Sequence, residues 1–331
     1  MKKVLLSVVA ALAVSAAPAS AADMSDKATK AMAAVAAPSP WDIAFGSALM
    51  SDYIFRGVTQ SNHKPSVAAY FEPRYNLNSN WQLYGGISGE SISFPNRAAA
   101  EIDLYGGVRP TFGPIALDLG FWYYGYPGGQ CFNAGTPLGA FGADCLANGN
   151  LPLNGNVIKK DMSFWEVYFK PTWNVNDAFA LGGTLFYTPS MMHSGAKGTY
   201  LSGTAKYTAP ATMAIAKDIG WYVSGEFGRQ YLGTTDSFYG LLNTANGPGI
   251  KYADYNTWNL GLGLTWKVFT LDLRYSDSNL SKGDCNAYTS DYTATQLGNV
   301  TAINPGGIGS NWCGSRFIAK LSADLTLGSL K

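Results

Sequence analysis

A period-two alternation of apolar and polar residues begins at Trp41 and recurs in about twelve segments. Segment 101–109 is typical, because Ile102 and Leu104 fall on one face and Asp103 and Arg109 on the other. Successive side chains of a β-strand point to opposite faces, so each segment predicts a strand with one apolar and one polar face. The last six segments span 179–187, 198–207, 221–231, 255–266, 269–277 and 316–327.

The connectors between these segments alternate between short and long. The short ones are 78–80, 110–113, 174–177 and 267–268, with 209–220 as a longer member of the set. The long ones are 57–65, 94–99, 125–161, 188–197, 232–254 and 278–315. Short turns at one end and long loops at the other are typical of a transmembrane barrel. We therefore expect an all-β fold: a transmembrane antiparallel β-barrel of about twelve strands over 41–331, with short periplasmic turns and long extracellular loops.

Aromatic residues are sorted by strand end. The short-turn ends of the apolar face carry Trp41, Trp81, Trp173, Trp221 and Trp266, and the loop ends carry Tyr53, Tyr123, Tyr187 and Tyr275. Two such belts match the two interfaces of a bilayer. A soluble sandwich with an aromatic core would not sort its aromatic residues in this way.

The stretch SDYIFRG at 51–57 places an acid and a base among aromatic residues. Continued alternation along the first strand directs Tyr53 and Phe55 toward lipid at the outer rim. The same alternation directs Asp52 and Arg56 toward a water-filled lumen, where their charges find water or each other.

The N-terminal residues have the features of an export leader. MKK is a short positive stretch, an apolar core follows, and ASA, which ends at Ala21, fits an A-x-A cleavage site. We expect a signal peptide at 1–21, a periplasmic N-terminal tail at 22–40, and a mature protein in the outer membrane of a Gram-negative bacterium. No later apolar run reaches the length of about 18 residues that a membrane-spanning helix needs.

The charge content is low for a soluble enzyme. Only 14% of the residues are charged, whereas about 25% is usual in soluble domains. The net charge of +1 gives no bulk attraction for nucleic acid. The expected partners are outer-membrane lipid and lipopolysaccharide, the barrel-insertion machinery and small solutes, and a homo-oligomer is left open.

Two stretches resemble the TorF family of porins. The S-D-Y-x-F-R-G motif is present as Ser51, Asp52, Tyr53, Phe55, Arg56 and Gly57, and the E-I-D-x-Y-x-G pattern as Glu101, Ile102, Asp103, Tyr105 and Gly107. The resemblance implies an outer-membrane barrel that lets small solutes diffuse. It implies no particular substrate and no functional residues.

Polar-face charges are the candidate pore-lining residues. Twelve strands tilted by about 40° close to a backbone radius of roughly 12 Å, which leaves a lumen for small hydrophilic solutes or ions unless a loop plugs it. Acids outnumber bases, which indicates a weak cation preference. Cross-strand ion pairs are the alternative, and enough of them would close the barrel. The candidates are Asp52, Arg56, Glu72, Arg74, Glu90, Glu101, Asp103, Arg109, Asp118, Glu166, Lys170, Glu226, Asp272 and Arg274.

Four cysteines and two histidines complete the candidate residues. Cys131 and Cys145 share one long loop, and Cys285 and Cys313 share another, so two intraloop disulfides are the economical pairing, with cross-loop bridges left open. His63 and His193 fall in predicted outer loops, and Ser194 next to His193 does not make a catalytic triad. We expect no enzyme activity, no cofactor and no metal-ligand motif. The alternative to a porin is a closed structural barrel, or a receptor or adhesin barrel that acts through its extracellular loops.

Overall fold

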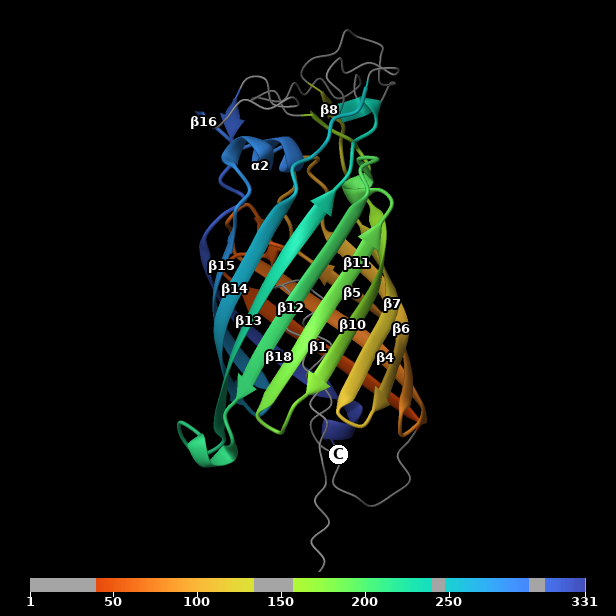
Figure 1. Ribbon diagram of the computed structural model, residues 1–331, viewed down its shortest axis with the longest axis vertical. Helices are drawn as coiled ribbons and strands as arrows, with labels where there is room; N and C mark the ends of the chain where they lie inside the picture. The colour runs from red at the N-terminus through yellow and green to blue at the C-terminus, as the bar shows by residue number, and fades with distance from the viewer. Residues whose placement is uncertain (1–39, 134–156, 240–247, 298–306, 331) are drawn as a thin grey trace, which may run out of the picture.

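A computed structural model describes residues 40–133, 157–239, 248–297 and 307–330 (Figure 1). Twelve long strands close into one barrel in which all neighbours are antiparallel, as the sequence predicts. They are β1 (Trp41–Met50), β4 (Ser66–Asn78), β5 (Trp81–Glu90), β6 (Glu101–Phe112), β7 (Ile115–Gly125), β10 (Phe164–Asn174), β11 (Phe179–Thr188), β12 (Gly198–Thr208), β13 (Ile219–Leu232), β14 (Tyr255–Trp266), β15 (Phe269–Ser278) and β18 (Arg316–Thr326).

Closure joins the first strand to the last. Leu49 of β1 lies opposite Val67 of β4 on one side and Leu321 of β18 on the other. The strands are strongly inclined to the long axis of the barrel (Figure 1). Short turns join strands at one end, at 79–80, 113–114, 175–178, 209–218 and 267–268. We call this the turn end, and the opposite end, where the longer connectors lie, the loop end.

The connectors carry only short elements among the described residues. At the loop end they are β2 (Ile54–Phe55), β3 (Val58–Thr59), β8 (Phe132–Asn133), β9 (Val157–Ile158), η2 (Met191–His193), η4 (Ser237–Tyr239), α2 (Lys282–Thr289), β16 (Gln296–Leu297) and β17 (Ile308–Gly309). At the turn end they are η3 (Ala211–Met213) and η5 (Leu327–Leu330). None of the helices in the described ranges is long and apolar enough to cross a membrane.

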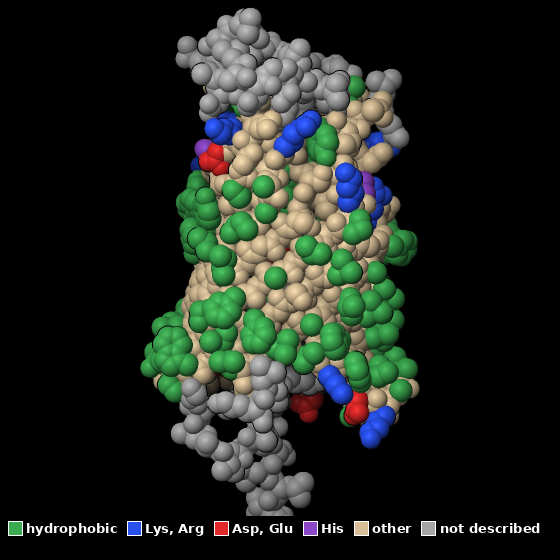
Figure 2. Space-filling model, turned by 180° about the vertical axis from the view of Figure 1, so that it is seen from behind, with side chains coloured by type: hydrophobic (Ala, Val, Ile, Leu, Met, Phe, Trp, Pro, Cys, Tyr) green, Lys and Arg blue, Asp and Glu red, His purple; other side chains and the backbone are tan. Residues whose placement is uncertain are grey.

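The outer face of the wall is apolar. Leu49, Phe71, Leu104 and Leu260 are about half exposed, and similar side chains line every strand of the barrel. On the face shown in Figure 2, hydrophobic side chains spread over the wall while Lys, Arg, Asp and Glu gather near the two ends. An apolar patch of this extent is far larger than a soluble monomer exposes.

The inside of the loop half is packed with aromatic rings. Tyr105 stacks on Trp122 with ring centroids 4.1 Å apart, and Tyr124 stacks on Phe164 at 4.5 Å. These rings belong to a buried cluster that draws residues from the wall and from the loops. A hydrophobic core therefore occupies space that an open pore would leave to water.

Candidate functional site: a plug in the lumen

The connector between β1 and β4 folds into the barrel and forms a plug, defined here as residues 51–65. β1 ends at Met50, and β2 and β3 then pair as a small hairpin, with Phe55 opposite Val58. Its two-residue loop is Arg56–Gly57, and both residues have positive φ, 48° and 78°. Positive φ at both positions is the mark of a type I′ hairpin turn, in which glycine carries no steric cost.

The prediction for 51–57 is wrong in one respect. Tyr53 and Phe55 do not face lipid: Tyr53 is only 1% exposed, and Phe55 packs against the inner aromatic cluster. Asp52 and Arg56 lie inside the barrel as predicted, but on the plug rather than on the first strand. The alternation of apolar and polar residues continues past Met50, although the chain leaves the wall there.

The tip of the plug is fastened to the far wall. Arg56 Nη1 donates to Glu166 Oε1 at 2.9 Å, and Nη2 donates to Glu166 Oε2 at 2.7 Å. Nη1 also donates to Gln230 Oε1 at 3.1 Å. Glu166 lies on β10 and Gln230 on β13, and the strands from β10 to β13 form the wall opposite β1. The Arg56 side chain thus joins the plug to the wall on the far side of the lumen.

Aromatic rings surround this ion pair. The Arg56 guanidinium lies 4.6 Å from the ring centroid of Tyr200 and 4.8 Å from that of Phe186, and Tyr124 donates its hydroxyl to Glu166 at 3.1 Å. Arg56 and Glu166 are 1% and 0% exposed. Burial works against the charged guanidinium, but the facing carboxylate of Glu166 outweighs it and raises the pKa of Arg56 above its ordinary value. A bidentate pair of this kind is strong only while water is excluded.

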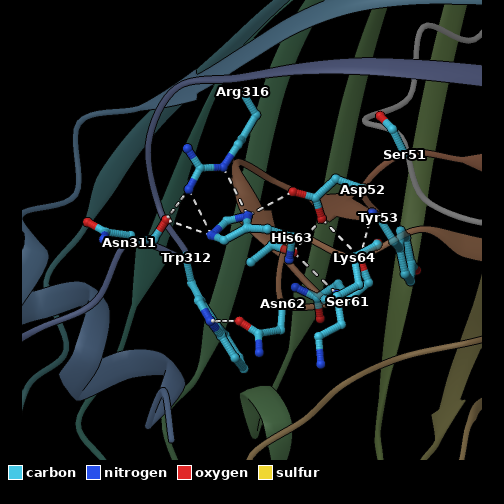
Figure 3. A network of polar contacts seen from close by, with 12 residues as sticks. Ser51, Asp52, Tyr53, Ser61, Asn62, His63, Lys64, Asn311, Trp312 and Arg316 are labelled. Carbon is cyan, nitrogen blue, oxygen red and sulfur yellow. Dashed lines mark hydrogen bonds and ion pairs between the residues drawn. The ribbon is translucent and has the colours of Figure 1, made fainter. Parts of the chain in front are cut away.

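The root of the plug is held by Asp52 (Figure 3). Its Oδ1 accepts from Thr59 at 2.5 Å and from Ser61 at 3.0 Å, and its Oδ2 lies 2.9 Å from His63 Nδ1. Ser61 Oγ accepts from the Tyr53 backbone N–H at 3.0 Å. These contacts close the hairpin on itself.

His63 and its neighbour Asn62 connect the root to the last strand. Arg316 Nη2, on β18, lies 2.8 Å from His63 Nε2, and the same guanidinium donates to the Asn311 carbonyl at 2.9 Å. Trp312 Nε1 donates to Asn62 Oδ1 at 2.9 Å (Figure 3). The predicted loop histidine is therefore a structural member of the plug.

A disulfide supports the outer edge of the plug. Thr59 N donates to the Trp312 carbonyl at 2.9 Å, and Val58 pairs with Cys313 in an antiparallel bridge. Cys313 is bonded to Cys285 of α2, which confirms that predicted pair. Cys145 lies outside the described residues, so its pairing with Cys131 stays a prediction.

The other charged candidates on the wall face the interior. Several form ion pairs with one another: Glu72 with Arg74 at 2.6 Å and with Arg109 at 2.8 Å, and Asp272 with Arg274 at 3.0 Å. The interior-facing candidates are Glu72, Arg74, Glu90, Glu101, Asp103, Arg109, Asp118, Glu166, Lys170, Glu226, Asp272 and Arg274.

Two small cavities border the plug. One cavity of about 20 Å³ lies between the plug and the loop-end residues Phe94, Tyr288 and Trp312, and another of about 10 Å³ lies between Gly57 and Arg274. A cavity needs about 10–15 Å³ to hold one water. In the described part of the barrel, these two spaces thus have room for single waters and not for a solute.

Comparison with known proteins gives a partial family match. A family described as "Bacterial protein of unknown function (Gcw_chp)" matches residues 34–145, a range that includes the plug and the segment 101–107. No curated protein matches the chain.

Solved barrels match over most of the chain at low identity. The NanC porin is 8% identical, with 86% of this chain and 98% of that one covered and a TM-score of 0.38. The KdgM porin is 9% identical, with 85% and 98% covered and a TM-score of 0.37. An OmpT loop-deletion mutant, an outer-membrane protein of Vibrio cholerae, is 11% identical, with 86% and 98% covered and a TM-score of 0.34. At these scores, no substrate or assembly state is carried over.

Proposed function

We propose that this chain is an outer-membrane barrel that is closed at rest by the plug and conducts small hydrophilic solutes only when the plug leaves the lumen. The observation that carries the proposal is the buried Arg56–Glu166 ion pair, which joins the plug to the opposite wall. The apolar outer face supports a membrane location, because exposing so large an apolar surface to water is unfavourable. The resemblance to TorF porins is consistent with a transport role.

The polar contacts that hold the tip of the plug favour a gate over a permanent seal. The plug is one continuous connector between neighbouring strands, and its tip is held by an ion pair and a hydrogen bond to Gln230. Both Arg56 and Glu166 regain hydration when the plug leaves, so their separation costs far less in a wet lumen than in a dry core. The barrel wall keeps all its strand pairs during this movement.

Uptake by liposomes tests this function. Liposomes that contain the refolded wild-type chain should take up a small neutral sugar at close to the background rate. The Arg56→Gln variant should admit the sugar, and the double variant Arg56→Gln/Glu166→Gln should be largely closed again, because neither side then holds an unpaired buried charge.

A closed barrel that acts through its loops is the second candidate, and the aromatic core of the loop half favours it. The same assay separates the two: if every plug variant inserts as a folded barrel and none admits the sugar, the closed barrel is correct. We infer no enzymatic role. Ser194 donates to the Met191 carbonyl at 2.6 Å and not to His193.

A further inference from the structure

Three carboxylates on neighbouring strands form a group with which no lysine or arginine of the described residues forms an ion pair. Glu90 at the end of β5 and Glu101 and Asp103 on β6 offer oxygens that all lie within 4.8 Å of one another. Their exposed fractions are 2%, 2% and 0%. The register of the sheet places Glu90 directly opposite Glu101, and like charges in that position repel. We call these residues the carboxylate cluster.

The cluster is unusual among the interior acids. Glu72, Glu166 and Asp272 each form an ion pair with an arginine, and Glu226 accepts hydrogen bonds from Tyr200 and Asn259. Within the described residues, no lysine or arginine forms an ion pair with a member of the cluster. Burying ionised carboxylates without a counter-charge is very costly.

Three buried oxygens of the cluster have no hydrogen-bond partner. Neither Glu90 Oε1 nor Oε2 has a hydrogen-bond partner, and Asp103 Oδ1 has none either. By contrast, Glu101 Oε1 accepts from the Tyr53 hydroxyl at 2.8 Å, and Asp103 Oδ2 accepts from Ser88 at 3.3 Å. The bonded oxygens fix two carboxylates in place, and the free ones are left to a ligand.

The dimensions suit a hard divalent cation. Ca²⁺ binds six to eight oxygens at about 2.3–2.6 Å, so two oxygens on the same ion are at most about 5 Å apart. The separations in the cluster fall within that limit. Mg²⁺ demands shorter, octahedral contacts at about 2.0–2.1 Å and suits the cluster less well. We propose that Glu90, Glu101 and Asp103 bind a Ca²⁺ ion in the barrel and that Tyr53 couples this ion to the plug.

The coupling follows from Tyr53. Its hydroxyl donates to Glu101 Oε1 at 2.8 Å and so joins the plug to the cluster. An ion that orients Glu101 also orients the acceptor of this bond, as an outer-shell partner does in metal sites. This coupling rests on the proposed gating function, whereas ion binding does not.

Terbium luminescence tests the binding. The refolded full chain in zwitterionic detergent, without lipopolysaccharide and freed of divalent ions by chelation, is titrated with Tb³⁺ under excitation of its aromatic residues. The wild type should give a saturable signal that Ca²⁺ displaces more effectively than Mg²⁺, and Ca²⁺ in large excess should raise the unfolding temperature by about 5 °C.

Substitutions in and near the cluster test whether its residues bind the ion. Glu90→Gln and Asp103→Asn should weaken Tb³⁺ binding by tenfold or more, while in chelator Glu90→Gln should unfold at a higher temperature than wild type, because the repulsion is relieved. Tyr53→Phe should weaken binding by about tenfold. Glu226→Gln, a buried acid outside the cluster, should bind as wild type does.

Three results would overturn the site. They are a wild type with no saturable Tb³⁺ signal and no stabilisation by Ca²⁺, full binding in Glu90→Gln, and equal loss in Glu226→Gln. The first would mean that protons rather than an ion neutralise the cluster. This assay does not measure conductance, so it tests ion binding at the cluster independently of whether the plug gates the barrel. If Ca²⁺ binds but leaves plug opening unchanged in a bilayer, only the coupling is wrong.

Discussion

Arg56 and Glu166 meet inside the barrel although 110 residues separate them, and their two parallel hydrogen bonds of 2.9 Å and 2.7 Å join a loop to the wall it faces. Breaking such a buried pair by removing one partner costs about 3–5 kcal/mol, because the other charge stays buried alone. That cost applies only while the plug is inserted. The pair therefore sets the balance between closed and open states.

The first prediction concerns this pair. Arg56→Gln should shift the balance toward the open state by on the order of a hundredfold, since about 3 kcal/mol corresponds to that factor. Amide hydrogen exchange in the plug should speed up accordingly. Lys251→Gln, which removes an exposed loop pair with Asp254, is the control and should change little. Equal exchange rates in Arg56→Gln and wild type would contradict the assignment.

The second prediction concerns the hairpin turn. A Cβ on Gly57 would lie 2.7 Å from Thr257 Oγ1 and 2.9 Å from the Ser278 Cβ, and φ at this residue is 78°. Gly57→Ala should therefore add a clash with the wall to the backbone strain and loosen the plug. Gly113→Ala is the matched control, because φ is 59° there and nothing lies within 4 Å. It should cost only the strain, about 1–2 kcal/mol. The unfolding temperature and the amide hydrogen exchange rates of the plug are measured for both variants. Similar losses of stability in the two variants would argue against contact between the tip of the plug and the wall.

The third prediction concerns the root. Asp52→Asn removes one of the two acceptor oxygens that together bind Thr59, Ser61 and His63. The backbone N–H groups of Tyr53 and Gln60 should then exchange faster, while those of the wall strands stay protected. Asp161→Asn, at a mostly exposed loop site, supplies the comparison. If the wall amides lose protection equally, the residue supports the whole barrel and not the plug.

The fourth prediction concerns the disulfide. Replacing Cys285 and Cys313 with serine frees the segment that pairs with Val58 and Thr59. A bond that closes a loop of this length contributes about 3–4 kcal/mol. The double variant should unfold at a lower temperature and open more often than oxidised wild type. A fall in stability without any change in opening would show that the bond serves the loops alone.

The fifth prediction concerns the outer wall. Leu321 is 49% exposed in the middle of β18, and Leu77 is 52% exposed near the turn end of β4. In a bilayer, Leu321→Arg should cost about 2–4 kcal/mol and Leu77→Arg about 0–1 kcal/mol. Unfolding in lipid vesicles measures both costs. If the wall instead contacts water, both substitutions should lower the free energy of unfolding by small and equal amounts.

Much of the wall could be predicted from alternation alone. The segment expected at 255–266 is β14 to the residue, and the one expected to end at 327 ends at 326. Burial on one face and apolar exposure on the other impose the period of two along every strand of a barrel. The alternating lengths of the connectors then show which end of the barrel carries the short turns and which carries the long loops.

The plug could not be predicted in the same way. Asp52, Tyr53 and Phe55 continue the alternation of β1. A hairpin inside the barrel and a strand of its wall can both carry alternating polar and apolar residues, so the pattern does not tell one from the other. The available signal was the Arg56–Gly57 pair, since glycine is favoured in a two-residue turn. The carboxylate cluster was hidden for another reason: Glu90 and Glu101 come together through the register of β5 and β6, and no ligand spacing shows this in the sequence.

Single-channel conductance in a planar bilayer tests the central claim, that the plug closes the lumen. The wild type is compared with a variant in which residues 54–59 are replaced by a short glycine–serine linker, both verified as heat-modifiable folded barrels. The account predicts a wild type that is closed almost all the time and a variant with sustained, cation-leaning current steps. Steady current through the wild type, or a silent and correctly folded variant, would contradict it.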